Sequence, residues 1–417
     1  MRTISLMLAS AALGAGAIGA AIGFDMNSPA KPVQEDWDRR PGPDSGRVAM
    51  MLDALGRTDP VVCELIADQI GNFWSSGEHA GVGRLVAAPR AVLAAKDSIG
   101  GQITDTRAID RLVSELSTAN SCVRRVAGKM LGHSSVAPAR LRTLLGDASA
   151  TIRESAAHAI GVGEVKELRS SLESALRDRD PAVGAMAAWA LGEIEDRASV
   201  PALVAALRGS EPRIRLAAIW ALGQIEDNRA VPEIVTALRD SDPAIRAMAA
   251  NALGDIEDDA AVGPLERALS SDADARVRSS AAEALGQLSA ASSAAPLGRA
   301  LSDASIVVRR AAAEALGDLD DVKTAPSELV AALRAGDPEL RHHAANALAE
   351  IADPATTPAL VDLLSDRSTE IRQHVAEALG EIGTPDAVKA LTRALEDGDP
   401  EVRRAAVEAL ADAKENE

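Results

Sequence analysis

The sequence predicts an all-α solenoid of about twelve helix-turn-helix repeats, each about 31 residues long, and three observations support this. An aliphatic residue in an ALG-like triplet recurs every 29 to 32 residues. The 417 residues include no Tyr, two Phe and four Trp, so the interior must consist of small aliphatic side chains, which suits helix-on-helix packing. No useful length of the chain alternates with the period of two expected of a strand. The recurring residues are Leu131, Ile160, Leu191, Leu222, Leu253, Leu285, Leu316, Leu348, Leu379 and Leu410.

Each repeat is expected to form two helices. The first is illustrated by residues 230–240, where apolar positions recur at three and four residues. The second begins at a turn, where Asp242 can cap free backbone N–H groups and Pro243 occupies the first helical position. Two weaker repeats, ending at Ile70 and Ile99, bring the total for residues 44–413 to about twelve without a long insertion.

Positions in each second helix can be counted from its Pro position as zero. Positions +2, +10 and +13 are mostly aliphatic and form the expected buried stripe. Position +11 is mostly Gly, which costs roughly 1 kcal/mol relative to Ala inside a helix, so we expect a close helix approach there. Position +3 is Arg in nine of the last ten repeats and is expected to pair with turn carboxylates. A column of arginines also resembles an anion site, which is the alternative.

The run from Asp242 to Ile256, with the pattern DPxVRxxAAxALGxI, resembles the short HEAT-like repeats of phycobilisome lyases. The resemblance covers about nine tenths of the chain. It implies a right-handed superhelix whose second helices line the concave side. Related repeats serve bilin lyases, a di-iron hydroxylase and plain binding scaffolds. The hydroxylases bind iron through His-Glu dipeptides, and this sequence has none, so that relative is disfavoured.

The N-terminal residues are expected to direct export. Residues 1–23 start with Arg2 and continue without charge to small residues, as export signals do. If uncleaved, the same segment is long enough to anchor the protein in the inner membrane. Residues 24–43 form a Pro-rich tether, residues 44–413 the solenoid and residues 414–417 a C-terminal tail. We therefore expect a periplasmic or secreted protein that contacts a membrane only through residues 1–23.

The formal net charge of −18 disfavours nucleic acid as a partner, because phosphate recognition requires clustered Lys and Arg. A protein partner, or an extended apolar or basic ligand, is more compatible with this charge. The sequence contains no Gly-rich phosphate loop, zinc-binding spacing or nucleophile elbow, and no cofactor is predicted.

Positions that vary between repeats, above all +8, are candidates for binding. Trp189 and Trp220 occupy +8 in neighbouring repeats, and Met186, Leu216 and Met248 accompany them. Ordinary helix spacing would place the two indoles about 8 to 10 Å apart, with a flat or chain-like ligand or a partner side chain between them. Gly184, the single departure from Arg at +3 in the last ten repeats, lies in the same region. The alternative is that these residues only fill local gaps.

An acidic track follows in the later repeats. It would attract basic peptides, although a solvated surface is the alternative interpretation. Asn251 precedes it at +8. The track comprises Glu283, Glu314, Glu377 and Glu408 at +8, with Asp255, Asp318, Glu350, Glu381 and Asp412 at +12.

Histidines and cysteines raise two further questions. His342, His343 and His374 cluster in adjacent repeats, either as a transition-metal site or as exposed polar residues. Cys63 and Cys122 are two repeats apart if residues 72–103 form a regular repeat, which is too far for a disulfide. A looped-out insertion would let them meet. We expect the regular repeat, hence two unpaired thiols.

The sequence therefore predicts an extracytoplasmic protein-binding scaffold that is not an enzyme and holds its partner in the concave groove. The alternative is a cofactor-handling enzyme or chromophore lyase, which would use His158 or the later histidines. The predicted binding residues are Met186, Trp189, Leu216, Trp220, Met248, Asn251, Glu283, Glu314 and Glu377.

Overall fold

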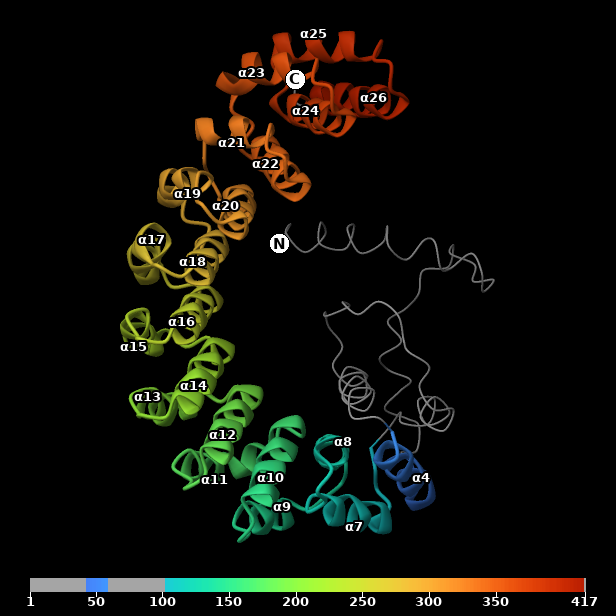
Figure 1. Ribbon diagram of the computed structural model, residues 1–417, viewed down its shortest axis with the longest axis vertical. Helices are drawn as coiled ribbons and strands as arrows, with labels where there is room; N and C mark the ends of the chain where they lie inside the picture. Colours follow the sequence, from blue (N-terminus) through green and yellow to red (C-terminus); the bar gives the residue numbers. More distant parts are fainter. Residues whose placement is uncertain (1–42, 59–101, 416–417) are drawn as a thin grey trace.

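The computed structural model describes residues 43–58 and 102–415, which form an arc of paired helices (Figure 1). In this part of the chain there are 21 α-helices and no β-strand, only one isolated bridge between Ile103 and Ser134. The all-α solenoid predicted from the sequence is confirmed. No helix among the described residues is long and apolar enough to cross a bilayer. Residues 1–23 lie outside them.

Ten complete helix pairs follow α4 (Ser45–Gly56). The pairs are α7 (Thr106–Glu115) with α8 (Ser121–Gly132), α9 (Pro138–Leu145) with α10 (Ala150–Val162), α11 (Arg169–Ala175) with α12 (Pro181–Ile194), α13 (Val200–Leu207) with α14 (Pro212–Ile225), α15 (Val231–Ala237) with α16 (Pro243–Ile256), α17 (Val262–Ser271) with α18 (Ala275–Gln287), α19 (Ala294–Ala300) with α20 (Ile306–Asp318), α21 (Ser327–Ala332) with α22 (Pro338–Ile351), α23 (Thr357–Leu363) with α24 (Thr369–Ile382), and α25 (Pro385–Ala394) with α26 (Pro400–Glu415). Three-residue 3-10 helices lead into α11, α13, α15, α17, α19 and α23.

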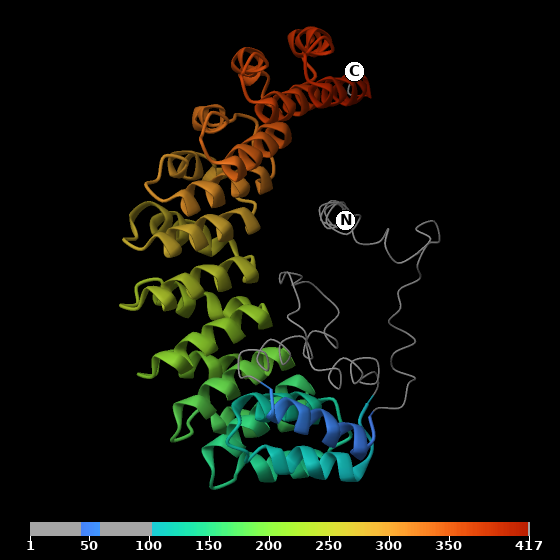
Figure 2. The same ribbon diagram turned by 45° about the vertical axis from the view of Figure 1, so that its right-hand side comes forward.

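The helices form two layers along the arc. The second helix of each pair packs on the second helix of the next, and the first helices pack mainly on their own partners. Figures 1 and 2 show the second helices, α8 to α26, along the inner side and the first helices along the outer side. The second helices therefore line the concave side, as the sequence resemblance implied.

The Asp-Pro turns start the second helices as expected. Asp242 accepts a hydrogen bond from Ala244 N at 2.9 Å, and Pro243 is the first residue of α16. Asp180 does the same for Ala182 N at 3.0 Å before α12. Each turn satisfies one of the N–H groups that a helix start leaves without an internal partner.

Close approach of neighbouring second helices explains the recurring glycines. A Cβ added to Gly192 in α12 would lie 2.9 Å from Ala221 Cα in α14, closer than real Cβ atoms approach. Ala188 and Ala250 at +7 are fully buried on the same ridge. The helix penalty of Gly is therefore offset by backbone-to-backbone packing that no larger residue permits.

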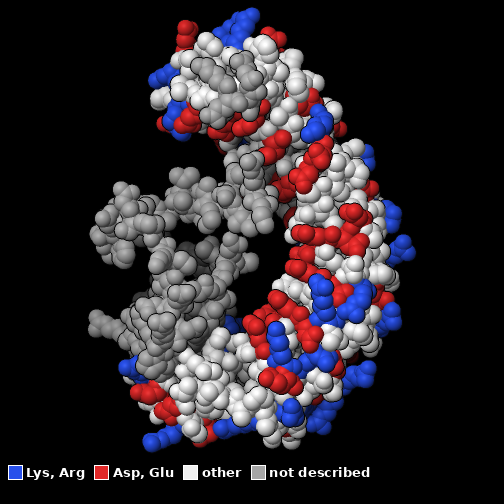
Figure 3. Space-filling model, turned by 180° about the vertical axis from the view of Figure 1, so that it is seen from behind, with Lys and Arg blue, Asp and Glu red and all other residues white. Residues whose placement is uncertain are grey.

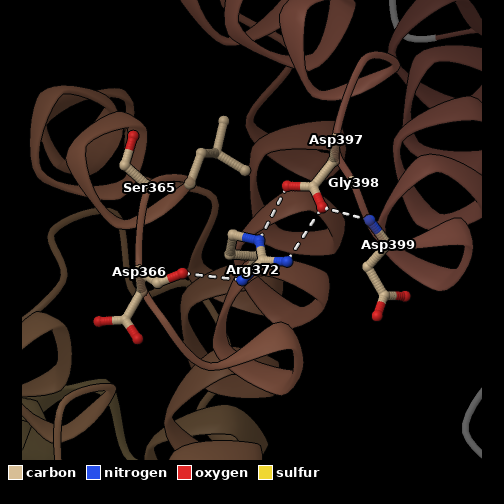
Figure 4. A pocket seen from close by; sticks show the side chains of 7 residues that line it. Ser365, Asp366, Arg372, Asp397, Gly398 and Asp399 are labelled. Atoms are coloured by element: carbon tan, nitrogen blue, oxygen red, sulfur yellow. Dashed lines mark hydrogen bonds and ion pairs between the residues drawn. The ribbon is translucent and has the colours of Figure 1, made fainter.

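Most of the arginines at +3 connect successive repeats. Arg372 donates two hydrogen bonds, at 2.8 and 2.9 Å, to the carboxylate of Asp397, which lies in the turn of the next repeat. It donates a third, at 2.8 Å, to Asp366 O in the turn of its own repeat (Figure 4). Arg246 holds Asp272 in the same way, and these side chains are largely buried. The internal ladder predicted from the sequence is confirmed. The same type of pair occurs at Arg153–Asp178, Arg215–Asp240, Arg278–Asp303 and Arg341–Glu370.

The ladder is interrupted between α12 and α14, where Gly184 replaces Arg. A Cβ on Gly184 would lie 2.7 Å from Ile214 Cδ1, so the Ile214 side chain fills the space beside it. In the turn of the next repeat, the position that carries the ladder Asp elsewhere is occupied by Gly209. Gly184 therefore has a packing role at this repeat interface. A 220 Å³ cleft opens here, lined in part by Leu176, Ala202, Ala206, Gly209 and Ile214.

At the N-terminal end, α4 packs directly on α7 and α8. Ser45 N donates to Asp105 Oδ2 at 2.9 Å, and a Cβ on Gly56 would lie 3.9 Å from Val123 Cγ2. The end of α4 thus lies beside Cys122 instead of two repeats away. Cys122 is disulfide-bonded, so the prediction of unpaired thiols is wrong for this residue. Cys63 and residues 72–101 of the expected repeat lie outside the described residues.

We expect Arg246→Ala to lower the free energy of unfolding by about 2 to 3 kcal/mol, because it leaves the largely buried Asp272 carboxylate without its cation. Urea titration of the two proteins measures the difference. Arg276→Ala is the matched control, since its ion pair with Asp274 is exposed on the arginine side. That control should cost less than about 0.5 kcal/mol. Equal losses in both variants would contradict a structural role for the ladder.

Candidate functional site

An aromatic row runs across three successive second helices on the concave side. His158 of α10 packs on Trp189 of α12 with ring centroids 5.2 Å apart. Trp189 stacks on Trp220 of α14 at 6.4 Å with 17° between the ring planes. All three side chains are half-buried. The row is therefore continuous, lies on one side of the molecule and remains open to contact.

Glycines hold the row in place. A Cβ on Gly161 in α10 would lie 2.7 Å from Trp189 Cζ3, and a Cβ on Gly192 in α12 would lie 2.7 Å from Trp220 Cζ3. Each indole therefore rests on the backbone of the preceding second helix. From the sequence, these glycines are expected only to allow a close approach of helices. Their role beneath the rings is visible only in the structure.

The two indoles are closer than ordinary helix spacing predicts. Their centroid distance of 6.4 Å is that of rings in offset stacking, so no ligand can lie between them. The expected separation of about 8 to 10 Å was wrong, because the Gly and Ala contacts bring the second helices unusually close. A ligand can only cover the exposed edges of the row or extend it at an end.

Apolar side chains flank the row. Met186 on α12, Leu216 on α14 and Met248 on α16 are half-buried and pack against the core. Asn251 on α16 is half-buried at the +8 position that follows Trp220. The predicted residues of α12, α14 and α16 are therefore brought together on adjacent helices.

His158 was not among the predicted binding residues, although it occupies +8 in the same column. Burial lowers the pKa of His158 to about 4, and the positive charges of Lys129 and Arg125 contribute. The imidazole is therefore neutral near pH 7 and extends the apolar surface. A search of position +8 for any aromatic ring, and not only for Trp, would have included His158.

Most residues of the acidic track lie farther along the arc than the row. Glu283, Glu314 and Glu377 are exposed on α18, α20 and α24. Figure 3 shows Asp and Glu side chains gathered near the inner edge of the arc, with Lys and Arg mostly toward the outer edge. The side chain of Asp412 lies outside the described residues. These carboxylates therefore belong to second helices farther along the arc than the aromatic row.

The later histidines do come together. The ring centroids of His342 and His374 are 5.1 Å apart, and those of His342 and His343 are 5.9 Å apart. His374 Nδ1 lies 3.2 Å from Glu377 Oε2, and Asn346 Nδ2 lies 3.3 Å from His342 Nε2. Across residues 43–58 and 102–415, no group of three or more His, Cys, Asp or Glu side chains is placed to hold a metal ion.

The fold and this surface define a helical-repeat protein whose layer of second helices carries an aromatic row, with exposed acidic side chains farther along the arc. A family model described as HEAT repeats matches residues 137–213, 200–286, 264–327 and 326–411. The chain belongs to the HEAT-repeat family, and the family predicted from the sequence is confirmed. No curated protein matches the chain.

Several solved structures are similar in fold, each with 22% sequence identity. An engineered protein has a TM-score of 0.40 and covers 88% of this chain and 99% of its own. The complex of CpcE and CpcF of phycocyanin lyase from Nostoc sp. PCC7120 has a TM-score of 0.36, with coverages of 59% and 94%. Human deoxyhypusine hydroxylase in complex with glycerol has a TM-score of 0.29, with coverages of 61% and 99%.

We expect the stability of the protein to fall as the pH drops from about 6.5 to 4, partly through His158. The unfolded imidazole binds a proton in this window and the folded one does not, a difference of up to about 3 kcal/mol. His158→Phe keeps a ring in the row and removes the titration. Urea titrations at pH 7 and pH 4.5 should show a smaller loss for this variant. An equal loss in both proteins would show that His158 is not held neutral.

Proposed function

We propose that this protein is an extracytoplasmic binding scaffold that holds an extended segment of a partner protein in its concave groove. The observation that carries the proposal is the aromatic row of His158, Trp189 and Trp220. Stacked rings left half-buried on a concave surface are a typical anchor for a partner, because Trp dominates binding hot spots.

The row can supply substantial binding energy. Each Trp offers about 150 to 250 Å² of surface, and burying apolar surface contributes about 25 cal/mol per Å². Covering the exposed parts of two indoles and of the flanking Met186, Leu216 and Met248 therefore contributes a few kcal/mol. The rings are already ordered by their contacts with Gly161 and Gly192, which reduces the entropy lost on binding.

The acidic side chains favour a basic partner. The net charge of −18 and the exposed Glu283, Glu314 and Glu377 produce a negative potential over the groove. Such a field accelerates encounter with a positive segment and orients it along the groove. Because these carboxylates are exposed, their contribution is screened by salt. The apolar contacts at the row are not.

Export is the part of the proposal that rests on residues 1–23 and on Cys122. The apolar N-terminal run has the composition of an export signal, cleaved or retained as a membrane anchor. The disulfide at Cys122 supports an oxidising compartment, because such bonds persist outside the cytoplasm.

The double variant Trp189→Ala plus Trp220→Ala should lose the partner recovered by the wild-type chain from its native envelope fraction. We expect retention to fall at least tenfold while the thermal midpoint stays nearly unchanged, since both rings are half-buried on the inner surface. Quantitative pull-down and thermal unfolding measure the two effects. A large loss of folding would instead assign the indoles to the core.

Two controls sharpen this test. Val307→Ala and Val407→Ala remove exposed apolar side chains outside the row and should leave partner recovery unchanged. Visible absorbance or bound metal in the purified wild-type protein would favour the second candidate, a cofactor-handling enzyme or chromophore lyase. The scaffold proposal expects neither.

Replacing Leu8 by Arg should block export, because a charge in the apolar run prevents its recognition and insertion. The variant should remain in the cytoplasm with Cys122 reduced. Cell fractionation and thiol alkylation measure both properties, and Leu8→Ile should behave as the wild type. Normal export of the Leu8→Arg protein would contradict the assignment of residues 1–23.

A further inference from the structure

The aromatic row ends at Trp220. The next step of the solenoid, meaning the interface between α14 and α16, is built differently. The +8 residue of α16 is Asn251 instead of a ring. Gly223 occupies in α14 the position that Gly161 and Gly192 occupy in α10 and α12. On each of those two glycines rests an indole of the next second helix. A Cβ on Gly223 would instead meet Ala252 and the Asp255 Oδ2 atom, the latter at 3.1 Å. The stack therefore stops beside a carboxylate.

Helical geometry places these groups around one position. Trp220 and Gly223 are three residues apart and share one face of α14, while Asn251 and Asp255 are four residues apart and share one face of α16. The two helices pack on each other. The indole of Trp220, the Asn251 amide and the Asp255 carboxylate thus border the same step of the solenoid, between α14 and α16.

We propose that this step binds the guanidinium of an arginine carried by the partner segment, stacked beyond Trp220 and paired with Asp255. The inference rests on the proposed function and names the chemistry of the anchoring residue. A guanidinium is planar and positively charged, so it stacks on Trp and pairs with a carboxylate at the same time.

Charge selects this occupant over an apolar ring. Asp255 is half-buried, and no ion pair involves it within residues 43–58 and 102–415, where its partner is the Gln287 side chain. Burial raises the pKa of Asp255, and the negative charge of Glu226 raises it further. An aromatic ring would leave this carboxylate uncompensated. A guanidinium supplies the missing cation.

Shape selects arginine over lysine. The spacing between consecutive rings in the row is 5.2 and 6.4 Å, which suits another flat group. An ammonium is a compact, strongly hydrated point charge that cannot continue a stack. The exposed Glu283, Glu314 and Glu377 offer no such plane and accept either cation. The step at Trp220 therefore distinguishes arginine, and the later carboxylates only attract positive charge.

The test uses the full chain and three small probes, N-acetyl-arginine amide, N-acetyl-citrulline amide and N-acetyl-lysine amide. Isothermal titration should show the arginine compound binding about tenfold tighter than its uncharged, equally planar citrulline analogue. It should also bind several-fold tighter than the lysine compound. Equal binding of arginine and citrulline, or of arginine and lysine, would overturn the proposal.

Asp318 provides the matched control. Asp318 Oδ2 lies 3.2 Å from a Cβ placed on Gly286, the same contact that Asp255 makes at Gly223, but no indole adjoins it. Asp255→Asn and Asp318→Asn remove the same charge. Only Asp255→Asn should abolish the preference for arginine over citrulline. Loss of the preference in both variants would reduce the effect to general attraction by the acidic groove.

The two proposals fail separately. If the double Trp variant loses the partner but the wild-type protein binds the arginine and citrulline compounds equally, the scaffold proposal stands and the arginine site is wrong. If arginine amide binds selectively while the double Trp variant keeps its partner, the site stands and the proposed function is wrong. Thermal midpoints of all variants show whether a loss reflects unfolding.

Discussion

The close approach of neighbouring second helices is the constraint on which the rest of this structure depends. A Cβ on Gly161 would lie 2.9 Å from Ala190 Cα, so at these positions the backbones themselves are in contact. The outer helices pack mainly on their own partners and less on one another. Inner helices that pack more tightly than outer ones bend the stack into the arc seen in Figure 1.

The same constraint produces the candidate site. Side chains at one position of successive second helices reach each other only because the helices are so close, as Trp189 and Trp220 do at 6.4 Å. The ladder pairs such as Arg246–Asp272 fix the turns of consecutive repeats and keep the helices in register. Where the ladder is absent at Gly184, Ile214 packs into the space instead. Packing and ion pairs are thus alternative ways of joining two repeats.

Most of the fold could be predicted from the sequence, because nearly every repeat carries the same sequence pattern. The Asp-Pro helix starts, the Arg ladder and the small +11 residues are local patterns with local physical causes. The candidate site could be predicted only in part. The sequence shows Trp189 and Trp220 as departures from the pattern, but it suggests His158 only as a residue of the alternative enzyme, because the neutral state that lets it extend the apolar row depends on burial. The bonded state of Cys122 was missed, since it depends on how α4 meets α8.

The sequence by itself determined that the chain is a HEAT-repeat solenoid, which residues face its neighbours and which vary on the inner surface. Periodicity carries this information, because a residue's position along a helix fixes the direction in which its side chain points. Only the tertiary structure decided the distances between repeats, the direct ring stacking and the position of the Asp255 carboxylate beside Gly223. Those depend on how closely two backbones approach, which is a property of the packed assembly of repeats.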